Sequence, residues 1–343
     1  MPLRSTLRAA LAAVVVCCAS APVAAQGLDL TIDHVCIALG DVPEVTGLRL
    51  NFRDSNLRRV AGMNVTIWNP YGEGTGVVRG IALGLPITGA REIDGLALGV
   101  FGVGATHRIR GIGIAPLGLG AGGSLDGIML AGVGVGSGGA MTGIGISGIG
   151  IGAAGRMRGL FVGGIGVGTG TSFDGVAIGG IGVGGGGEVR GIVLGGVGVG
   201  SSGSVSGLAV GGVGVGAGGD LTGVAIGGIG VGAGGTLRGL AFGGIGVGAQ
   251  RIRGAAISGF GAGGMDVRGV LLAGGWNKIE RGGTLTGVTI SSFNQVKGAQ
   301  HGLAIGIVNF AEELHGVQVG LINIARNNSR GARVLPLVNF HRD

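Results

Sequence analysis

The chain has 343 residues, of which 88 are glycine and seven are proline. Collagen is excluded because these glycines do not follow a strict Gly-X-Y period, and disorder is disfavoured because 45% of the residues are hydrophobic and 12% are charged. The net charge of +7 comes from charges scattered singly among few aromatic residues, so the composition does not indicate a nucleic-acid partner.

Residues 1–25 have the pattern of a secretory signal peptide. Two arginines, Arg4 and Arg8, precede an apolar core, and small residues ending at Ala25 favour cleavage before Gln26. The sequence therefore predicts that the chain is exported and that its leader is removed.

The cysteines bear on how the leader is processed and on disulfide formation. Lipidation at Cys17 or Cys18 is an alternative to simple cleavage, although the residues before them fit a lipoprotein site poorly. Simple cleavage leaves Cys36 as the single cysteine, which excludes an intrachain disulfide.

No further apolar run is long enough for a transmembrane helix. We expect the protein at the cell surface, in the periplasm or outside the cell.

A short repeat covers nearly the whole exported part. After a mixed segment at 26–46, which we expect to cap the end of the fold, one glycine recurs mostly every 15 or 16 residues. The period is most regular over 159–253, where a typical repeat reads GVAIGGIGVGAGGTLR. A unit this short cannot bury an apolar face alone, so the repeats must stack as rungs. We predict an all-β fold, a parallel β-solenoid of about 19 rungs over 47–343. The anchor glycines, numbered as position 0 of each rung, are Gly47, Gly62, Gly80, Gly95, Gly111, Gly127, Gly143, Gly159, Gly175, Gly191, Gly207, Gly223, Gly239, Gly254, Gly269, Gly287, Gly302, Gly316 and Gly331.

Alternation around each anchor predicts which residues lie inside the solenoid. The side chain at position −2 is apolar from Val45 through Leu285. Apolar residues also recur at positions +1 and +3 and, after a Gly-Gly step, at +6 and +8. Period-two alternation marks one face of a strand, and the Gly-Gly step can turn the chain. We expect these aliphatic side chains to line a thin interior, with flat outer faces of glycine and alanine.

Position −1 is polar through most of the array, which predicts an exposed column of side chains. Arg and Asp alternate between neighbouring rungs in its first half, an order that helps to set the register, although exposed ion pairs contribute only about 0–1 kcal/mol each. From Arg238 the column is basic, at Arg238, Arg253 and Arg268, which would suit an anion. The other members are Arg79, Asp94, Arg110, Asp126, Thr142, Arg158, Asp174, Arg190, Ser206 and Thr222.

Asparagines replace glycine toward both ends of the array, at or next to position +7. Glycine and asparagine both adopt a left-handed backbone readily. We therefore interpret this place as a turn position, at which stacked asparagine side chains can also hydrogen-bond along a column. The residues are Asn69, Asn277, Asn294, Asn309, Asn323 and Asn339.

The terminal repeats resemble a known family. The segments GLRLNF at Gly47, GMNVTIWNP at Gly62 and GLAIGIVNFAEELHGVQVGLINIARNN at 302–328 are similar to bacterial surface-repeat proteins built on GLxxGLxN units. The likeness is good at both ends and loose in the glycine-rich centre. It implies an exported repeat protein and carries over no catalytic or binding residue.

Neither a phosphate-binding loop nor a reactive thiol is indicated. The G-x-G-x-x-G windows around Gly134 and Gly214 are followed by another Gly/Val strand, whereas a dinucleotide site needs a following helix. His34 and Cys36 would face the same side of a strand, but this pair is a weak thiol candidate without a further partner.

The other histidines and carboxylates give no metal or catalytic site either. His301 and His315 each precede an anchor glycine and could be neighbours, but zinc needs three or four ligands. Glu312 and Glu313 are adjacent in an expected turn and would point apart. We predict no catalytic, cofactor or metal site and therefore no enzyme.

The sequence thus predicts a non-catalytic exported protein with a structural or surface-interaction role. Its partner would be a second copy, the cell envelope or a polymer, held through the flat Gly/Ala faces. One alternative is a flat-face binding module for ice or polysaccharide, although Thr222, Thr236 and Thr286 do not form a regular file. The other is an outer-membrane β-barrel, which the scarcity of aromatic residues and the short apolar runs disfavour.

Overall fold

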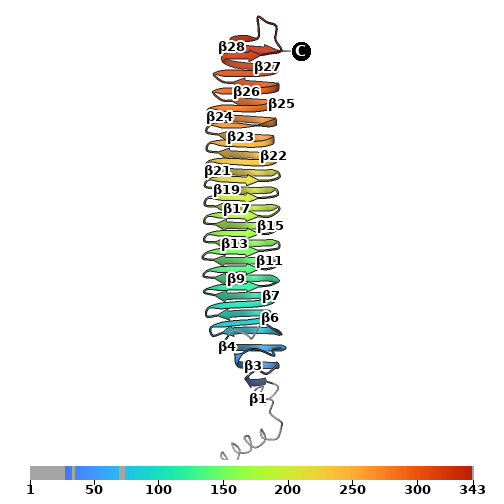
Figure 1. Ribbon diagram of the computed structural model, residues 1–343, viewed down its shortest axis with the longest axis vertical. Coiled ribbons are helices and arrows are strands. Elements are labelled where there is room, and N and C mark those ends of the chain that lie inside the picture. Colours follow the sequence, from blue (N-terminus) through green and yellow to red (C-terminus); the bar gives the residue numbers. More distant parts are fainter. Residues whose placement is uncertain (1–27, 33–34, 69–73, 342–343) are drawn as a thin grey trace, which may run out of the picture.

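The structure is a computed structural model that describes residues 28–32, 35–68 and 74–341. The predicted signal peptide, Cys17, Cys18, His34 and Asn69 lie outside these residues. Within them the chain forms strands and no helix, and the strands stack into one long, straight column (Figure 1).

The strands are short in the middle of the chain and longer toward its ends. The first half contains β1 (Leu28–Ile32), β2 (Val35–Leu39), β3 (Glu44–Arg53), β4 (Arg59–Trp68), β5 (Val77–Gly84), β6 (Ile87–Gly99), β7 (Gly102–Ala115), β8 (Gly118–Ala121), β9 (Ser124–Ala131), β10 (Gly134–Ser137), β11 (Met141–Ser147), β12 (Gly150–Ala153), β13 (Met157–Gly163) and β14 (Gly166–Thr169). The second half contains β15 (Phe173–Gly179), β16 (Gly182–Gly185), β17 (Val189–Gly195), β18 (Gly198–Ser201), β19 (Val205–Gly211), β20 (Gly214–Ala217), β21 (Leu221–Gly227), β22 (Gly230–Gly243), β23 (Gly246–Ser258), β24 (Gly261–Ala273), β25 (Trp276–Ile290), β26 (Phe293–Ile305), β27 (Val308–Ala325) and β28 (Val334–His341).

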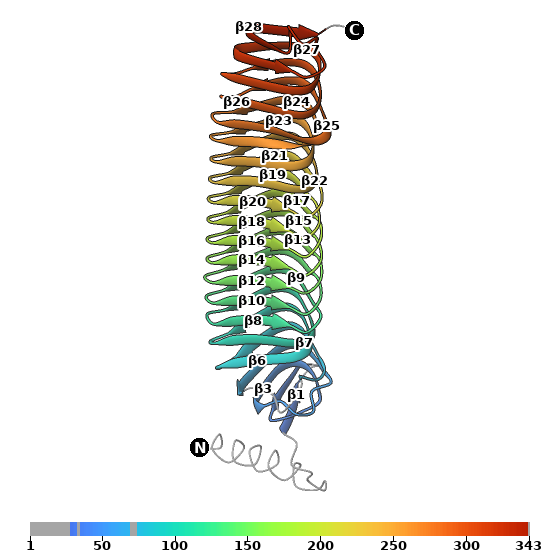
Figure 2. The same cartoon turned by 45° about the horizontal axis from the view of Figure 1, so that its top comes forward.

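Equivalent strands of successive rungs pair in parallel and in register. In the centre each rung has one longer and one shorter strand, such as β13 and β14, which pair with β15 and β16 of the next rung. Figure 2 shows the short strands β8 to β20 stacked in one sheet, with the longer strands beside them. The stack has about 17 turns, close to the predicted 19. The predicted parallel β-solenoid is confirmed, and its parallel registers disfavour the alternative of an outer-membrane barrel.

Each end of the stack carries an antiparallel strand. β1 pairs antiparallel with β2, and β2 joins the first rung in parallel. At the opposite end β28 pairs antiparallel with β27. Gly331, which we expected to anchor a last rung, lies in the turn between these two strands. It is not an anchor, because the chain reverses there.

Three columns of buried side chains form the core. Position −2 is buried in every rung from Val45 to Leu285, as predicted. Position +8 is also buried and is valine in most central rungs, for example Val167 and Val183. The third column is position +2, which is alanine in many rungs, for example Ala177. The core therefore lies between the long and the short strands along the whole array.

The prediction that side chains at positions +1, +3 and +6 line the interior is wrong. Ile178 at +3 is 37% exposed and Ile181 at +6 is 53% exposed, whereas Ala177 between the two strand positions is fully buried. Alternation places the even positions of the strands inside, and position +6 lies in the turn between the long and short strands. On the long strands the aliphatic side chains at positions +1 and +3 are therefore outside and the alanines at +2 are inside, the reverse of the expectation for these positions.

The narrow core explains why small residues occupy position +2. A Cβ on Gly113 would overlap Leu119 at position +8 of the same rung, and a Cβ on Gly145 would crowd both Ile151 and Phe161. Position +2 is thus glycine where +8 is the larger leucine or isoleucine, and next to the large ring of Phe161. Interiors are close-packed, so added volume at one place must be removed at its neighbour.

The anchor glycines meet a steric constraint between rungs. From Gly47 to Gly302 every anchor has a positive φ, between 110° and 137°. A Cβ on Gly191 would overlap the carbonyl oxygen of Gly175, the anchor of the preceding rung. Glycine is needed at position 0 both for its backbone conformation and for this close approach.

We predict that Gly191→Ala destabilises the protein and that Gly184→Ala does not. The sparsely populated backbone conformation should cost about 1–3 kcal/mol at Gly191, and the overlap with Gly175 adds to this cost. Gly184 faces outward with no atom within 4 Å of an added Cβ, so its replacement should be neutral or stabilise by up to about 1 kcal/mol. Urea unfolding followed by circular dichroism compares the two variants. Equal losses would contradict the assignment of the anchors.

Candidate functional site: two uncharged faces and a charged edge

The outward side chains of the long strands form one continuous apolar face. It consists of positions +1 and +3 together with position +6 at the adjoining turn. Many of these side chains are between 37% and 60% exposed over the central rungs, and others, such as Val176 and Val210, are partly buried. Exposed apolar patches of more than a few hundred Å² mark interaction sites in soluble proteins. The members of this apolar face include Ile112, Ile114, Leu117, Ile128, Val133, Ile144, Ile146, Ile149, Ile165, Ile178, Ile181, Ile192, Val197, Val213, Ile226, Ile229, Leu240, Phe242, Ile245 and Phe260.

The outward positions of the short strands form a second face, made of glycine at +7 and +9. At position +9, a Cβ would meet nothing within 4 Å on Gly168, Gly184, Gly200, Gly216 or Gly232. At position +7 an added Cβ would make only ordinary or slightly tight contacts. Glycine in a strand lowers stability by roughly 0.5–1 kcal/mol relative to alanine. The fold itself does not demand these glycines, and the result is a flat, uncharged glycine face.

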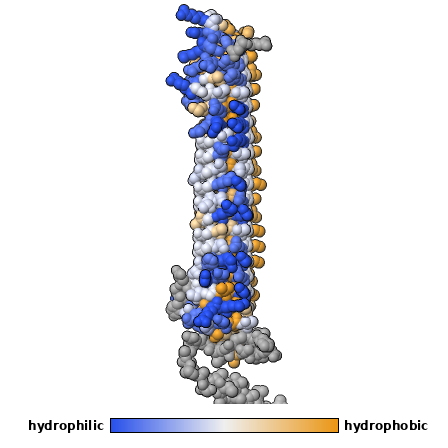
Figure 3. All heavy atoms as spheres, turned by 90° about the vertical axis from the view of Figure 1, so that its right-hand side faces the viewer, coloured by the Kyte–Doolittle hydropathy of each residue, from blue (hydrophilic) through white to orange (hydrophobic). Residues whose placement is uncertain are grey.

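All charge in the central array lies on one edge. Between Gly80 and Gly275 every Asp, Glu, Lys and Arg occupies one of the last five positions of its repeat. Figure 3 looks onto this edge, where blue side chains gather along the length between a pale side and a row of orange side chains. The solenoid is therefore amphipathic around its axis.

Ion pairs connect successive rungs along this charged edge. The expected contact between neighbouring −1 positions occurs at Arg158 and Asp174, 3.8 Å apart. The pair of Arg238 and Asp220 is 3.0 Å long. The amide of Thr236, which donates to the Asp220 carboxylate at 2.8 Å, and the nearby Arg238 lower the pKa of Asp220. These side chains are exposed, so the pairs contribute little to stability and serve mainly the register.

The predicted basic column lies in register, with Arg238 beside Arg253 and Arg253 beside Arg268. Asp266 lies on the rung of Arg268 and pairs in register with Arg251 of the rung before. An acidic side chain therefore lies within the basic stretch, which weakens the case for an anion site there.

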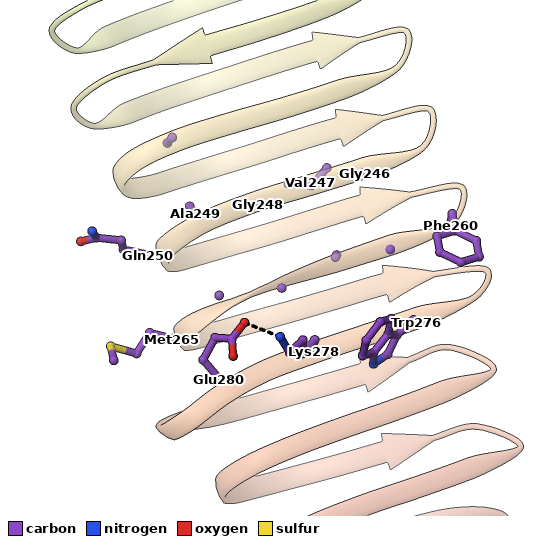
Figure 4. A pocket seen from close by; sticks show the side chains of 15 residues that line it. Gly246, Val247, Gly248, Ala249, Gln250, Phe260, Met265, Trp276, Lys278 and Glu280 are labelled. Atoms are coloured by element: carbon purple, nitrogen blue, oxygen red, sulfur yellow. Dashed lines mark ion pairs between the residues drawn. The ribbon is translucent and has the colours of Figure 1, made fainter.

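The glycine face ends at an abrupt step on β25. Trp276 and Lys278 occupy the register positions of Gly261 and Gly263 in the preceding rung. The Trp276 ring stacks on Phe293 with centroids 6.2 Å apart, and Lys278 lies 5.9 Å from the Trp276 centroid and pairs with Glu280 at 2.6 Å. Figure 4 shows the side chains of Trp276, Lys278 and Glu280 beside the backbone of Gly246 and Gly248 in a nearby rung. The open hollow has a volume of about 830 Å³ and is mostly apolar.

Sequence reasoning missed this step, although the signal was present. Aligning the repeats on their anchors puts Trp276 and Lys278 in columns that are glycine for most of the array. A column in which an aromatic and a charged residue replace glycine marks a local change of surface.

A buried polar cluster occupies the core of the first rungs, which sequence reasoning also missed. Arg49 is fully buried at position +2 and pairs with Asp41 at 2.7 Å and with Asp54. Its guanidinium also donates to Asn64 Oδ1 at 2.9 Å, and Thr66 donates to Asp54 at 3.0 Å. A buried charge is tolerated where it is paired and hydrogen-bonded. The cluster satisfies its own polar groups and is a structural feature of this end.

The asparagines near the C-terminal end form a buried ladder rather than turns. Asn277 and Asn294 lie in register with Ala262, which continues the buried valine column at position +8. Asn294 donates to Asn309 at 2.8 Å, and Asn309 donates to Asn323 at 2.7 Å. Among the described residues, Leu337 is the only non-glycine with a positive φ. The prediction that these asparagines occupy turns with a left-handed backbone is therefore wrong, whereas the predicted column of hydrogen bonds is present.

The histidine and carboxylate candidates have no metal geometry. His301 and His315 stack with centroids 4.7 Å apart, as expected, and His341 lies 6.1 Å from His315. The described residues contain no group of three or more His, Cys, Asp and Glu side chains placed to hold a metal ion. Glu312 and Glu313 lie within β27 rather than in a turn.

The phosphate-loop candidates are strands, as expected. Gly134 begins β10 and Gly214 begins β20, and each is followed by a further strand rather than a helix. Cys36 lies on β2, beside Gly47 of β3. No helix in the described ranges is long and apolar enough to cross a membrane.

No family model, curated protein or solved structure matches the chain. The resemblance of the terminal repeats to GLxxGLxN proteins therefore stays a prediction.

We predict that Asn309→Val and Asn323→Val are each destabilising but not additive. Each single change leaves the other asparagine with an unpaired buried polar group, which costs about 1–3 kcal/mol. The double variant removes both partners of that bond, so its loss should be smaller than the sum of the two single losses. A double-mutant cycle of urea unfolding measures this difference. Strict additivity would show that the ladder bond contributes nothing.

Proposed function

We propose that this chain is an exported, non-catalytic protein with a structural or surface-interaction role. The observation that carries the proposal is the confinement of charge to one edge, which leaves two long uncharged faces. Charged groups are costly to remove from water, so faces without them can be covered by a partner at low cost. The leader-like pattern of residues 1–25 supports export.

The rigidity of the array supports a scaffold role. Each rung contacts its neighbours through in-register parallel strands along the whole stack. The buried polar groups at both ends bond to one another inside the protein, as in the Arg49 cluster and the asparagine ladder. These features hold extended faces in a fixed shape.

Export is tested by expressing the full chain in a bacterium and comparing it with a chain that lacks residues 2–25. We expect the full chain to leave the cytoplasm with an N-terminus at Gln26, and the shortened chain to stay inside. Cell fractionation, N-terminal sequencing and protease treatment of intact cells provide the measurements. A full chain that stays in the cytoplasm with its leader intact would overturn the exported role.

The step on β25 favours a second candidate function, the binding of a polysaccharide. A flat floor of glycine leads to the exposed Trp276 ring, with Lys278 and Glu280 beside it as hydrogen-bonding groups. Ligand sites combine apolar and aromatic surface with a few placed polar groups. A sugar ring could stack on the indole while its hydroxyl groups meet the charged pair.

We predict that Trp276→Ala weakens the retention of the protein on insoluble polysaccharides, whereas Trp68→Ala does not. Both tryptophans are exposed, but Trp68 lies at the opposite end of the array, on β4. Loss of one aromatic contact worth about 0.5–1.5 kcal/mol corresponds to roughly a two- to twelvefold weaker binding. Co-sedimentation with cellulose, chitin and peptidoglycan measures it. An equal loss in both variants, or no retention of the wild type, would rule out this site.

A further inference from the structure

The apolar face extends over both ends of the array. Leu50 on β3 is exposed at the N-terminal end. At the other end β28 continues the same columns, because Val338 and Phe340 pair in register with Val319 and Val317 of β27. Val338 and Phe340 are 46% and 67% exposed. The face therefore runs without interruption from the first rung to the last strand.

The size of this face matches that of a stable protein interface. With about 17 turns spaced about 4.8 Å apart, the face is about 80 Å long. Positions +1 and +3 are about 7 Å apart along the strand, and the +6 column widens the face to roughly 12 Å. The product is on the order of 1,000 Å², above the roughly 800 Å² per partner of a standard interface.

We propose that the apolar face is the interface of a face-to-face homodimer, a deepening that rests on the proposed surface-interaction role. Two copies share the same spacing between rungs, so the aliphatic ridges of one can enter the grooves of the other, as in the dry zippers between paired sheets. A two-fold axis makes such a contact closed and self-complementary. Each rung of slippage would return one turn of apolar surface to water, so full overlap limits the assembly to two chains.

Composition favours a second copy over a lipid surface. Apolar surfaces that bind anionic membranes are bordered by Lys and Arg. The column that borders this face has seven arginines, but Asp94, Asp126 and Asp174 alternate with them in its first half, so the border is not continuously basic. A second copy of the same face is uncharged, so no like charges repel each other when the two faces meet.

The glycine face is the natural control surface, because it belongs to the same rungs and is equally uncharged. Ile178 at position +3 is matched by Gly184 at +9 of its rung, and Ile226 is matched by Gly232. A side chain added at Gly184 or Gly232 meets no atom within 4 Å. Lysine can therefore be placed on either face of the same two rungs.

The test measures the mass of the purified protein in solution by light scattering and sedimentation equilibrium at micromolar concentration. We expect the wild type and the double variant Gly184→Lys/Gly232→Lys to have twice the mass of one chain. The double variant Ile178→Lys/Ile226→Lys should have the mass of one chain, with an unchanged β-sheet circular dichroism spectrum. A monomeric wild type, or dissociation by the lysines on the glycine face, overturns the proposal.

Cross-linking provides a second measurement that does not depend on the lysine variants folding. In a chain whose native cysteines are replaced by serine, Ile192→Cys places a thiol near the middle of the apolar face, and Gly200→Cys places one on the glycine face of the same rung. We expect a short bis-maleimide to link two chains through position 192 and not through position 200. The reverse pattern overturns the proposal.

Binding to lipid vesicles tests whether the apolar face contacts a membrane instead of a second copy of the chain. If the wild type is a monomer that floats with phosphatidylglycerol vesicles, and Ile178→Lys/Ile226→Lys abolishes flotation, the face binds lipid and the dimer is wrong. The cell fractionation described above is independent of these results. An exported monomer would contradict only the dimer, whereas a dimer kept in the cytoplasm would contradict only the exported role.

Discussion

The close approach of successive rungs at the anchor glycines is the constraint on which the rest of the structure depends. An added Cβ at an anchor would overlap the carbonyl oxygen of the anchor before it, and the positive φ is one that other residues rarely adopt. Every rung must therefore repeat its glycine at the same place, and the strands must stay in register. Because the anchors stay in register, the other positions of the central rungs form straight columns along the solenoid.

Because each position of the repeat forms a column, the residue type at that position determines the character of an extended surface. The interior is narrow, so a large side chain in one buried column lies beside a small residue in the other: Gly113 lies beside Leu119, and Gly145 lies beside Ile151 and Phe161. Long side chains at the odd positions have no place inside and form the apolar face instead. Glycine at positions +7 and +9, where a side chain would fit, leaves the opposite face flat. The two faces differ, and the charged edge separates them on one side.

The ends differ from the centre in what fills the core. Asparagine takes over the valine column near the C-terminal end, and a paired arginine lies inside the first rungs. Buried hydrogen bonds are directional, so they specify neighbours more strictly than aliphatic contacts do. Such groups distinguish the end rungs from the near-identical central ones, whose repetition alone would allow many alternative alignments.

The sequence by itself determined the solenoid, the place of the anchors other than Gly331, the buried −2 column and the polar −1 column, because these follow from a glycine period and from positions that are apolar or polar in nearly every rung. It could not determine which of the neighbouring apolar positions lies inside. Residues such as Val176, Ala177 and Ile178 are all apolar, so the alternation of apolar and polar residues does not show which of them is buried. The prediction that the larger side chains line the core is wrong for this reason. Only the tertiary structure decided this, because the separation of the two sheets sets the volume available between them. The same holds for the burial of the asparagine ladder, because the asparagines continue the buried column of the neighbouring rungs, which are about 15 residues away in the chain but adjacent in the stack.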